Sequence, residues 1–214
     1  MASPATFADV KTRIITETLR DDLQDTLANA LTQTIINSVN HYEWERWWFN
    51  ESIFNATCVV GSIYVPIDPS IIRIDTIRAI IGGVRYKMIE RQVDWILAAY
   101  STPVQGQPTE WAILNDQIVI FPQPNQAYPL QMQTLTHVTP VYDGTDDFVS
   151  NMWSTVGQDL IVSRAKIMLD RDYLSATATD PRLQLASAAE DEAYTELRSQ
   201  NNRRMATDRV EPAW

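Results

Sequence analysis

The amino-acid sequence predicts an α+β fold, in which a helical bundle of about four helices carries an inserted antiparallel β region. Apolar residues recur at helical spacing near both ends of the 214-residue chain, whereas short β-branched runs between Pro, Gly and Asn fill its middle. A chain of this length with 45% hydrophobic residues buries one sizeable core or two small ones. We therefore expect a helical domain over 1–52 and 146–204, a β domain over 53–145 and a C-terminal tail over 205–214.

Two helices are expected before the β region. Ser3 and Pro4 resemble a helix cap and a first-turn proline, and an apolar spacing from Phe7 to Leu19 follows them. A longer helix is expected from about Leu27 to Trp48. Its end carries five aromatic residues within eight positions, and such a cluster needs a large apolar partner: Tyr42, Trp44, Trp47, Trp48 and Phe49.

The β region is predicted from two hairpins. Gly82 and Gly83 separate two β-branched runs, and glycine supplies the positive φ angles that a two-residue turn requires. Asn115 and Asp116 form the second turn, and the prolines after Phe121 end the strand pairing because proline cannot donate to a sheet ladder.

Two further helices close the chain. One is expected over Asn151 to Leu174, and Asp180 with Pro181 begins the next. The apolar stripe of this last helix contains several alanines. Small residues of this kind let a neighbouring helix approach closely.

Composition excludes several classes of function. The formal net charge of −10 argues against a protein that grips nucleic-acid phosphates, although an acidic surface still lets a duplex pass without sticking. Cys58 is the single cysteine, so the chain has neither an internal disulfide nor a multi-cysteine metal site. We find neither a secretory signal nor an apolar run long enough for a membrane helix, and we expect no membrane partner.

The residues that could carry chemistry form no recognisable catalytic set. His41 and His137 lack metal-ligand partners at helical or hairpin spacing. The best cation candidates are Asp143, Asp146 and Asp147, but their spacing favours capping or loop roles. A nucleophile elbow and a glycine-rich phosphate loop are both missing. We therefore expect no enzyme activity, no catalytic residue, no cofactor and no metal.

Several segments resemble the head-tail adaptor proteins of tailed phages, also called connector or head completion proteins. The similarity lies in LRDDL at Leu19 to Leu23 and in HYEWERWWFNES at His41 to Ser52. It continues in SIYVPIDPSIIRID at Ser62 to Asp75, and in PTEWAILNDQIVIFPQPNQAYPLQM at Pro108 to Met132. The two closing helices complete a resemblance that spans nearly the whole chain.

The resemblance implies a viral structural protein of the virion neck, made in the host cytoplasm during assembly. It implies a homo-oligomeric ring, usually dodecameric, that binds beneath the portal protein and offers its far face to tail or nozzle proteins. Double-stranded DNA would cross the central channel without specific binding. A C-terminal arm docks onto the portal in related adaptors, and the corresponding residues here are Arg203, Arg204, Met205, Arg209, Val210 and Trp214.

The chain contains seven tryptophans, the residue type most enriched at binding hot spots. Trp44, Trp47 and Trp48 either pack between the helices and the β region or contact a neighbouring subunit. The alternative function is a carbohydrate-binding or tail-associated virion module, in which Trp95, Tyr100 and Trp111 would stack on sugar rings. The helical halves of the chain count against this alternative.

Overall fold

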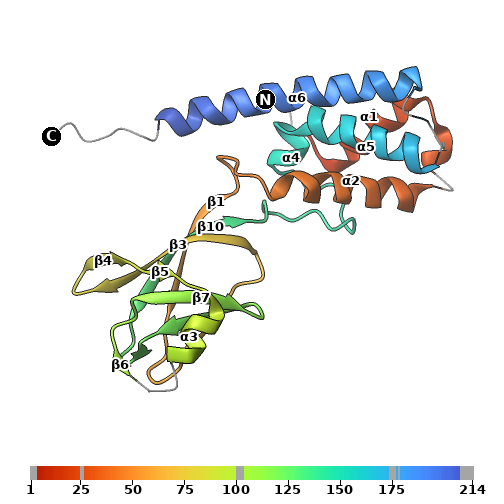
Figure 1. Ribbon diagram of the computed structural model, residues 1–214. Helices are drawn as coiled ribbons and strands as arrows, with labels where there is room; N and C mark the ends of the chain where they lie inside the picture. Colours follow the sequence, from red (N-terminus) through yellow and green to blue (C-terminus); the bar gives the residue numbers. More distant parts are fainter. Residues whose placement is uncertain (1–3, 25–26, 100–103, 174–176, 178, 208–214) are drawn as a thin grey trace. The chain divides into compact units, whose positions relative to one another are not determined.

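The chain folds into two compact units, which Figure 1 shows in a computed structural model. The structure describes residues 4–24, 27–99, 104–173, 177 and 179–207. The helical unit combines Met1–Phe49 with Val138–Trp214, and the β unit is Asn50–His137. Each unit has its own buried apolar core, so the two are described separately.

The helical unit is arranged around one central helix, α5, which packs against α1, α2, α4 and α6. A short 3-10 turn at Asp21–Leu23 follows the first helix. The α-helices of this unit are α1 (Phe7–Thr18), α2 (Ala28–Glu43), α4 (Met152–Thr155), α5 (Gln158–Tyr173) and α6 (Pro181–Thr207).

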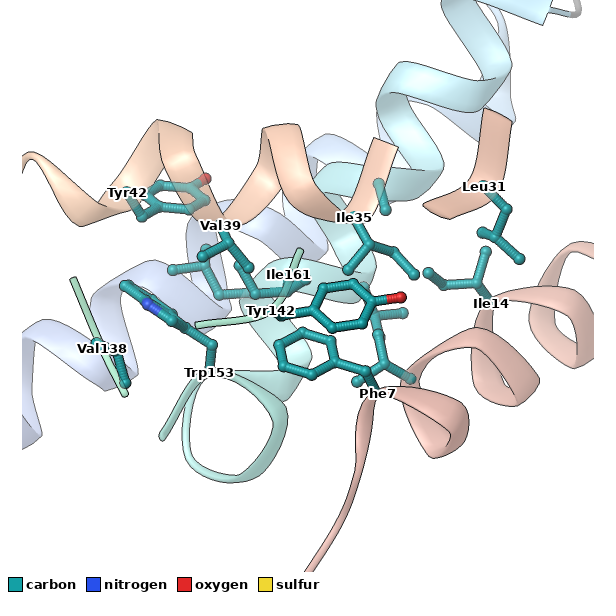
Figure 2. Close-up of a cluster of buried hydrophobic side chains, with 14 of the residues drawn as sticks. Phe7, Ile14, Leu31, Ile35, Val39, Tyr42, Val138, Tyr142, Trp153 and Ile161 are labelled. Atoms are coloured by element: carbon teal, nitrogen blue, oxygen red, sulfur yellow. The ribbon is translucent and has the colours of Figure 1, made fainter. Parts of the chain in front are cut away.

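The core of the helical unit is built from the apolar stripes that the sequence predicts. Phe7 and Ile14 of α1 are fully buried, as are Ile35 of α2 and Ile161 of α5, and Figure 2 shows these side chains converging. The Phe7 ring stacks on the ring of Tyr142 with 3.9 Å between centroids. Removal of these apolar faces from water is the main force that holds the helices together.

The β unit contains a main sheet and a smaller second sheet. The main sheet is antiparallel throughout, in the order β1-β10-β3-β4, from β1 (Glu51–Thr57), β3 (Ile71–Ile81), β4 (Val84–Lys87) and β10 (Pro129–Thr136). The second sheet has the order β2-β8-β7-β5, from β2 (Tyr64–Pro66), β5 (Ile89–Glu90), β7 (Glu110–Leu114) and β8 (Gln117–Phe121). Two short strands, β6 (Gln105–Gly106) and β9 (Gln123–Pro124), form a third sheet.

Both predicted hairpins are confirmed. Gly82 and Gly83 join β3 to β4 with φ angles of 56° and 84°. Asn115 and Asp116 join β7 to β8 with φ angles of 48° and 57°. Positive φ at both central residues matches the right-handed twist of the flanking strands, which explains why these residue types occupy the turns.

The expected fold class, a bundle of about four helices with an inserted antiparallel β region, is wrong. The described residues form six α-helices and ten strands in three sheets. One of these helices, α3 (Val93–Ala99), lies among the strands and packs against β7 and β8. The β region is also not purely antiparallel, because β5 pairs with β7 and β6 pairs with β9 in parallel.

Local packing explains the differences. The single helix expected over Asn151 to Leu174 is divided into α4 and α5 near Gly157, whose N–H donates to the Met152 carbonyl at 2.9 Å. A Cβ at Gly157 would lie 2.7 Å from Cε3 of Trp153, so the backbone passes too close to the indole for a larger residue. Helix α3 escaped the sequence analysis because seven residues are too few for helical periodicity to stand out among strands.

Candidate partner-binding surface

The aromatic segment that follows α2 is held by its own tryptophan. The indole N–H of Trp47 donates to the carbonyl oxygen of Tyr42 at 2.9 Å. The same carbonyl also accepts the Glu45 backbone N–H at 3.1 Å, so two donors serve this carbonyl at the end of the helix. The helix ends at Glu43 and not near Trp48, where the apolar spacing predicts its end.

The three tryptophans of this segment lie in different environments. Trp47 is fully buried, and its ring is nearly perpendicular to the ring of Trp153 at 6.1 Å. Trp48 is partly buried against the same core. Trp44 is 65% exposed, so most of its indole is available to a partner.

Asn201 fastens the C-terminal part of α6 to this segment. Its side chain is buried, its Oδ1 accepts the Trp48 backbone N–H at 2.8 Å, and its Nδ2 donates to the Arg46 carbonyl at 3.1 Å. A buried amide with both ends bonded fixes the register of two segments. Sequence reasoning missed Asn201 because a polar residue in a helix is usually assigned to solvent.

Arginines of α6 cover the tryptophan rings. The Arg198 guanidinium lies 5.2 Å from the Trp47 ring centroid, and that of Arg204 lies 4.5 Å from the Trp48 ring centroid. Arg198 also pairs with Glu45 at 3.2 Å. Cation–π contacts of this kind stabilise a surface that carries both aromatic and basic groups.

A groove runs along α6 beside these contacts. It is shallow and open to solvent, and all of its lining residues belong to α6: Tyr194, Thr195, Arg198, Ser199, Asn202 and Arg203. The Tyr194 hydroxyl donates to Glu45 at 2.9 Å, which holds the tyrosine in place at the groove. We call this region the α6 groove.

The structure thus brings together two sets of residues that the sequence analysis treated separately. Arg203 and Arg204 are exposed on the last turns of α6, and Met205 is half-buried there. Arg204 contacts Trp48 of the aromatic segment. Arg209, Val210 and Trp214 lie outside the described residues.

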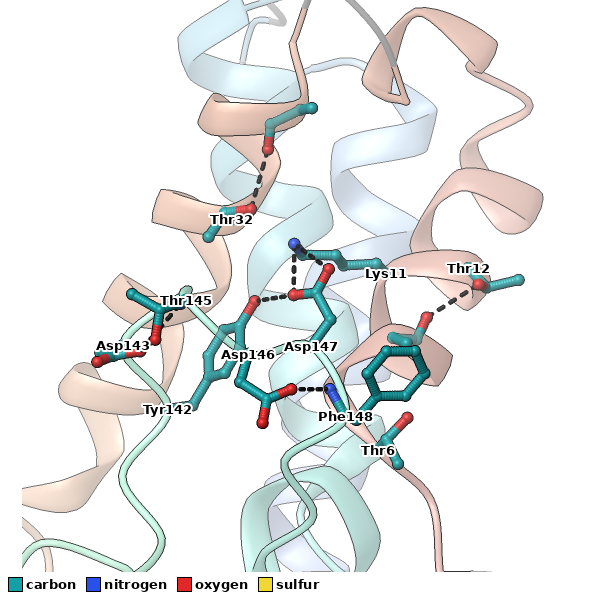
Figure 3. Close-up of polar contacts among 12 residues, drawn as sticks. Thr6, Lys11, Thr12, Thr32, Tyr142, Asp143, Thr145, Asp146, Asp147 and Phe148 are labelled. Atoms are coloured by element: carbon teal, nitrogen blue, oxygen red, sulfur yellow. Dashed lines mark hydrogen bonds and ion pairs between the residues drawn. The ribbon is translucent and has the colours of Figure 1, made fainter.

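The acidic loop lies elsewhere in the helical unit, and its carboxylates bond within the chain (Figure 3). Asp143 accepts the Thr145 backbone N–H at 2.9 Å, and the Thr145 bonds lower the pKa of this carboxyl. Asp147 accepts from the Tyr142 hydroxyl at 2.9 Å and pairs with Lys11 at 2.7 Å. Burial, with the neighbouring Asp147 carboxylate, raises the pKa of Tyr142.

Other candidate chemistry is not assembled in the described part of the chain. There, no group of three or more His, Cys, Asp or Glu side chains could hold a metal ion, and no helix is long and apolar enough to cross a membrane. Cys58 is buried, and burial raises the pKa of its thiol. Trp111 is 1% exposed and so cannot stack on a sugar, Trp95 is 46% exposed, and Tyr100 lies outside the described residues.

Comparison with protein families gives a match that covers both units. A family model described as SU10 adaptor protein matches residues 5–213. No curated protein matches the chain.

Proposed function

Because the chain belongs to the SU10 adaptor protein family, a family of phage head-tail adaptors, we propose that it forms a closed homo-oligomeric ring beneath the portal. The ring is dodecameric, links the capsid to the tail or nozzle proteins, and lies in the neck of the virion. Its role is structural and involves no catalytic step. The family match over residues 5–213 carries this proposal.

Contacts between neighbouring copies fall on the aromatic segment. Trp44 is 65% exposed, and a large exposed aromatic residue is the kind of anchor that dominates protein interfaces. We assign Trp44 and Trp48 to the surface of this subunit interface, and the buried Trp47 supports it from below. The cation–π contact between Arg204 and Trp48 keeps that surface ordered before a partner arrives.

The portal contact falls on the end of α6 and the residues after it. Arg203, Arg204 and Met205 are followed by Arg209, Val210 and Trp214, so this part of an otherwise acidic chain combines positive charge with apolar anchors. Such a combination suits an acidic portal surface with apolar recesses. Removal of residues 205–214 is expected to weaken portal attachment while the fold is retained.

Genome DNA passes through the ring without specific binding. The formal net charge of −10 means that the surface as a whole repels phosphates, which favours passage over adhesion. Assembly takes place in the host cytoplasm.

The mass of the purified chain in solution, alone and mixed with portal rings, tests the ring. We expect closed rings of uniform copy number, seen by native mass spectrometry and by electron microscopy. A strictly monomeric chain that does not attach to portal rings at micromolar concentration would overturn the proposal.

A further inference from the structure

The segment from Thr139 to Val149 presents one aromatic side chain to solvent. Phe148 is 81% exposed. Its backbone is nevertheless fixed, because its N–H donates to Asp146 Oδ1 at 2.9 Å. The carbonyls on either side of it accept from α1, that of Asp147 from Ala8 at 2.8 Å and that of Val149 from Phe7 at 3.0 Å.

The same segment is fastened to α2. Gly144 has a φ of +85°, and a Cβ there would lie 2.6 Å from Cγ2 of Thr32, so the loop backbone lies directly on the helix. Tyr142 stacks on Phe7, and Asp147 pairs with Lys11, as Figure 3 shows for the ion pair. Phe148 is therefore displayed on a backbone that is ordered before any partner binds. An aromatic anchor of this kind loses little entropy on binding.

The charge around Phe148 identifies a chemically matching surface on the same chain. The segment from Thr139 to Val149 holds three aspartates and neither Lys nor Arg. The α6 groove is open to solvent and is lined by the aromatic residue Tyr194 together with Arg198 and Arg203. Because the chain has 27 acidic and 17 basic residues, two copies repel each other unless their contact places opposite charges together.

The two surfaces lie on different sides of the helical unit. The segment bonds to α1 and packs on α2, whereas α6 packs against α5 (Figure 1). Because Phe148 and the α6 groove lie on different sides of the unit, a contact between them joins two copies head to tail. Repetition of such a contact generates a ring when its rotation closes.

We propose that Phe148 of one copy packs against Tyr194 in the α6 groove of the next copy, with Asp143 and Asp146 facing Arg198. This inference rests on the ring proposed above and names a second contact between neighbouring copies, in addition to the one at the aromatic segment.

Cysteine cross-linking tests the contact. Phe148→Cys and Ser199→Cys are introduced singly and together, and Cys58 is buried and so does not compete. Rings, formed alone or on portal, are oxidised and separated under denaturing conditions. We expect the double variant to give a ladder of covalent oligomers, an equimolar mixture of the two single variants to give dimers only, and each single variant to remain monomeric.

Truncation of the Phe148 side chain gives a second test of the contact. We expect Phe148→Ala to raise the protein concentration needed for half-maximal ring assembly on the order of tenfold or more, as loss of a hot-spot anchor does. Leu185→Ala is the matched control, because Leu185 is a 72% exposed apolar residue of the same unit outside the groove, and we expect no change. Circular dichroism shows whether each variant is folded. If Phe148→Ala is not folded, Phe148→Ser is measured in its place.

The outcomes separate the inference from the ring itself. Rings that assemble normally with Phe148→Ala, or that give no cross-link in the double variant, overturn the contact and leave the ring standing. Disulfide dimers of Phe148→Cys alone would indicate a symmetric contact and would also overturn it. If wild-type chains form no ring with or without portal, both proposals fail.

Discussion

At the residue scale, burial distinguishes three tryptophans that the sequence groups together. Trp47 is inside the helical core, Trp48 is at its margin, and Trp44 is largely in solvent. All three residues carry the same indole, so their contributions to stability differ because each removes a different apolar area from water. Stability should therefore depend on Trp47, and partner binding on Trp44.

Replacement of these residues by alanine tests the distinction. Trp47→Ala should lower the free energy of unfolding by about 3–5 kcal/mol, because it leaves a cavity and removes the hydrogen bond to the Tyr42 carbonyl. Trp44→Ala should change it by no more than about 0.5 kcal/mol. Urea unfolding followed by circular dichroism measures both. Equal losses for the two variants would contradict the assignment.

A buried carboxyl gives the chain a predictable response to pH. Asp170 of α5 is 8% exposed, and burial raises its pKa although the charge of Arg182 opposes this. A raised pKa in the folded state means that the folded chain holds this proton more tightly than the unfolded chain. The contribution of Asp170 to stability is therefore full below the ordinary aspartate pKa, near 3.8, and is lost as the pH rises through the folded-state value.

Asp170→Asn should remove this response. We expect the variant to be more stable than the wild type at pH 7 and to lack the fall in stability above about pH 4 that Asp170 causes. Chemical unfolding at a series of pH values measures the effect, and identical profiles for the wild type and Asp170→Asn would refute it.

At the element scale, α1 and α4 begin where a side chain accepts the first free N–H groups of the helix. The sequence suggested Ser3 and Pro4 for α1, but the cap is Thr6, which forms a reciprocal capping box with Asp9. Asn151 caps α4 and also donates to the Pro140 carbonyl at 3.0 Å. The second bond ties the start of the helix to the preceding loop.

Substitution of Asn151 separates the two roles. Asn151→Ala should lower the free energy of unfolding by about 1–2 kcal/mol, because both the cap and the bond to Pro140 are lost. Asn151→Ser keeps a capping oxygen and should cost less. Thermal unfolding followed by circular dichroism ranks the two variants, and a serine variant no more stable than the alanine variant would show that the cap contributes little.

At the scale of the whole molecule, the chain enters and leaves the β unit at two neighbouring points of its main sheet. Glu51 at the start of β1 pairs with Leu135 near the end of β10, and the Thr136 N–H donates to the Asn50 carbonyl at 2.9 Å. The β unit thus enters and leaves through neighbouring strands, the arrangement that lets an inserted domain fold by itself. We propose that each unit is a separate domain.

Excision of the β unit tests this proposal. Residues 50–137 expressed alone should unfold cooperatively, since the unit has its own cores around Ile77 and Ile96. A chain in which a short glycine linker joins Phe49 to Val138 should keep its helical circular dichroism spectrum. Fragments that are unfolded in isolation would show that the units depend on each other.

The sequence by itself determined the apolar stripes of the helices in the outer segments and the hairpin turns at Gly82-Gly83 and Asn115-Asp116. It also showed that recognisable catalytic motifs are absent. Each of these depends on neighbouring residues, because periodicity and turn chemistry are local. The motif resemblance also predicted the adaptor family, which the match over residues 5–213 confirms.

Only the tertiary structure decided how the segments meet. Spacing shows that Trp47 lies on an apolar face but not which helix covers it, and nothing local indicates that Asn201 will bond to Trp48 and Arg46. The break at Gly157 likewise follows from the neighbouring Trp153 ring. These features arise from contacts between residues far apart in the chain or from close packing in three dimensions, and a one-dimensional pattern does not record them.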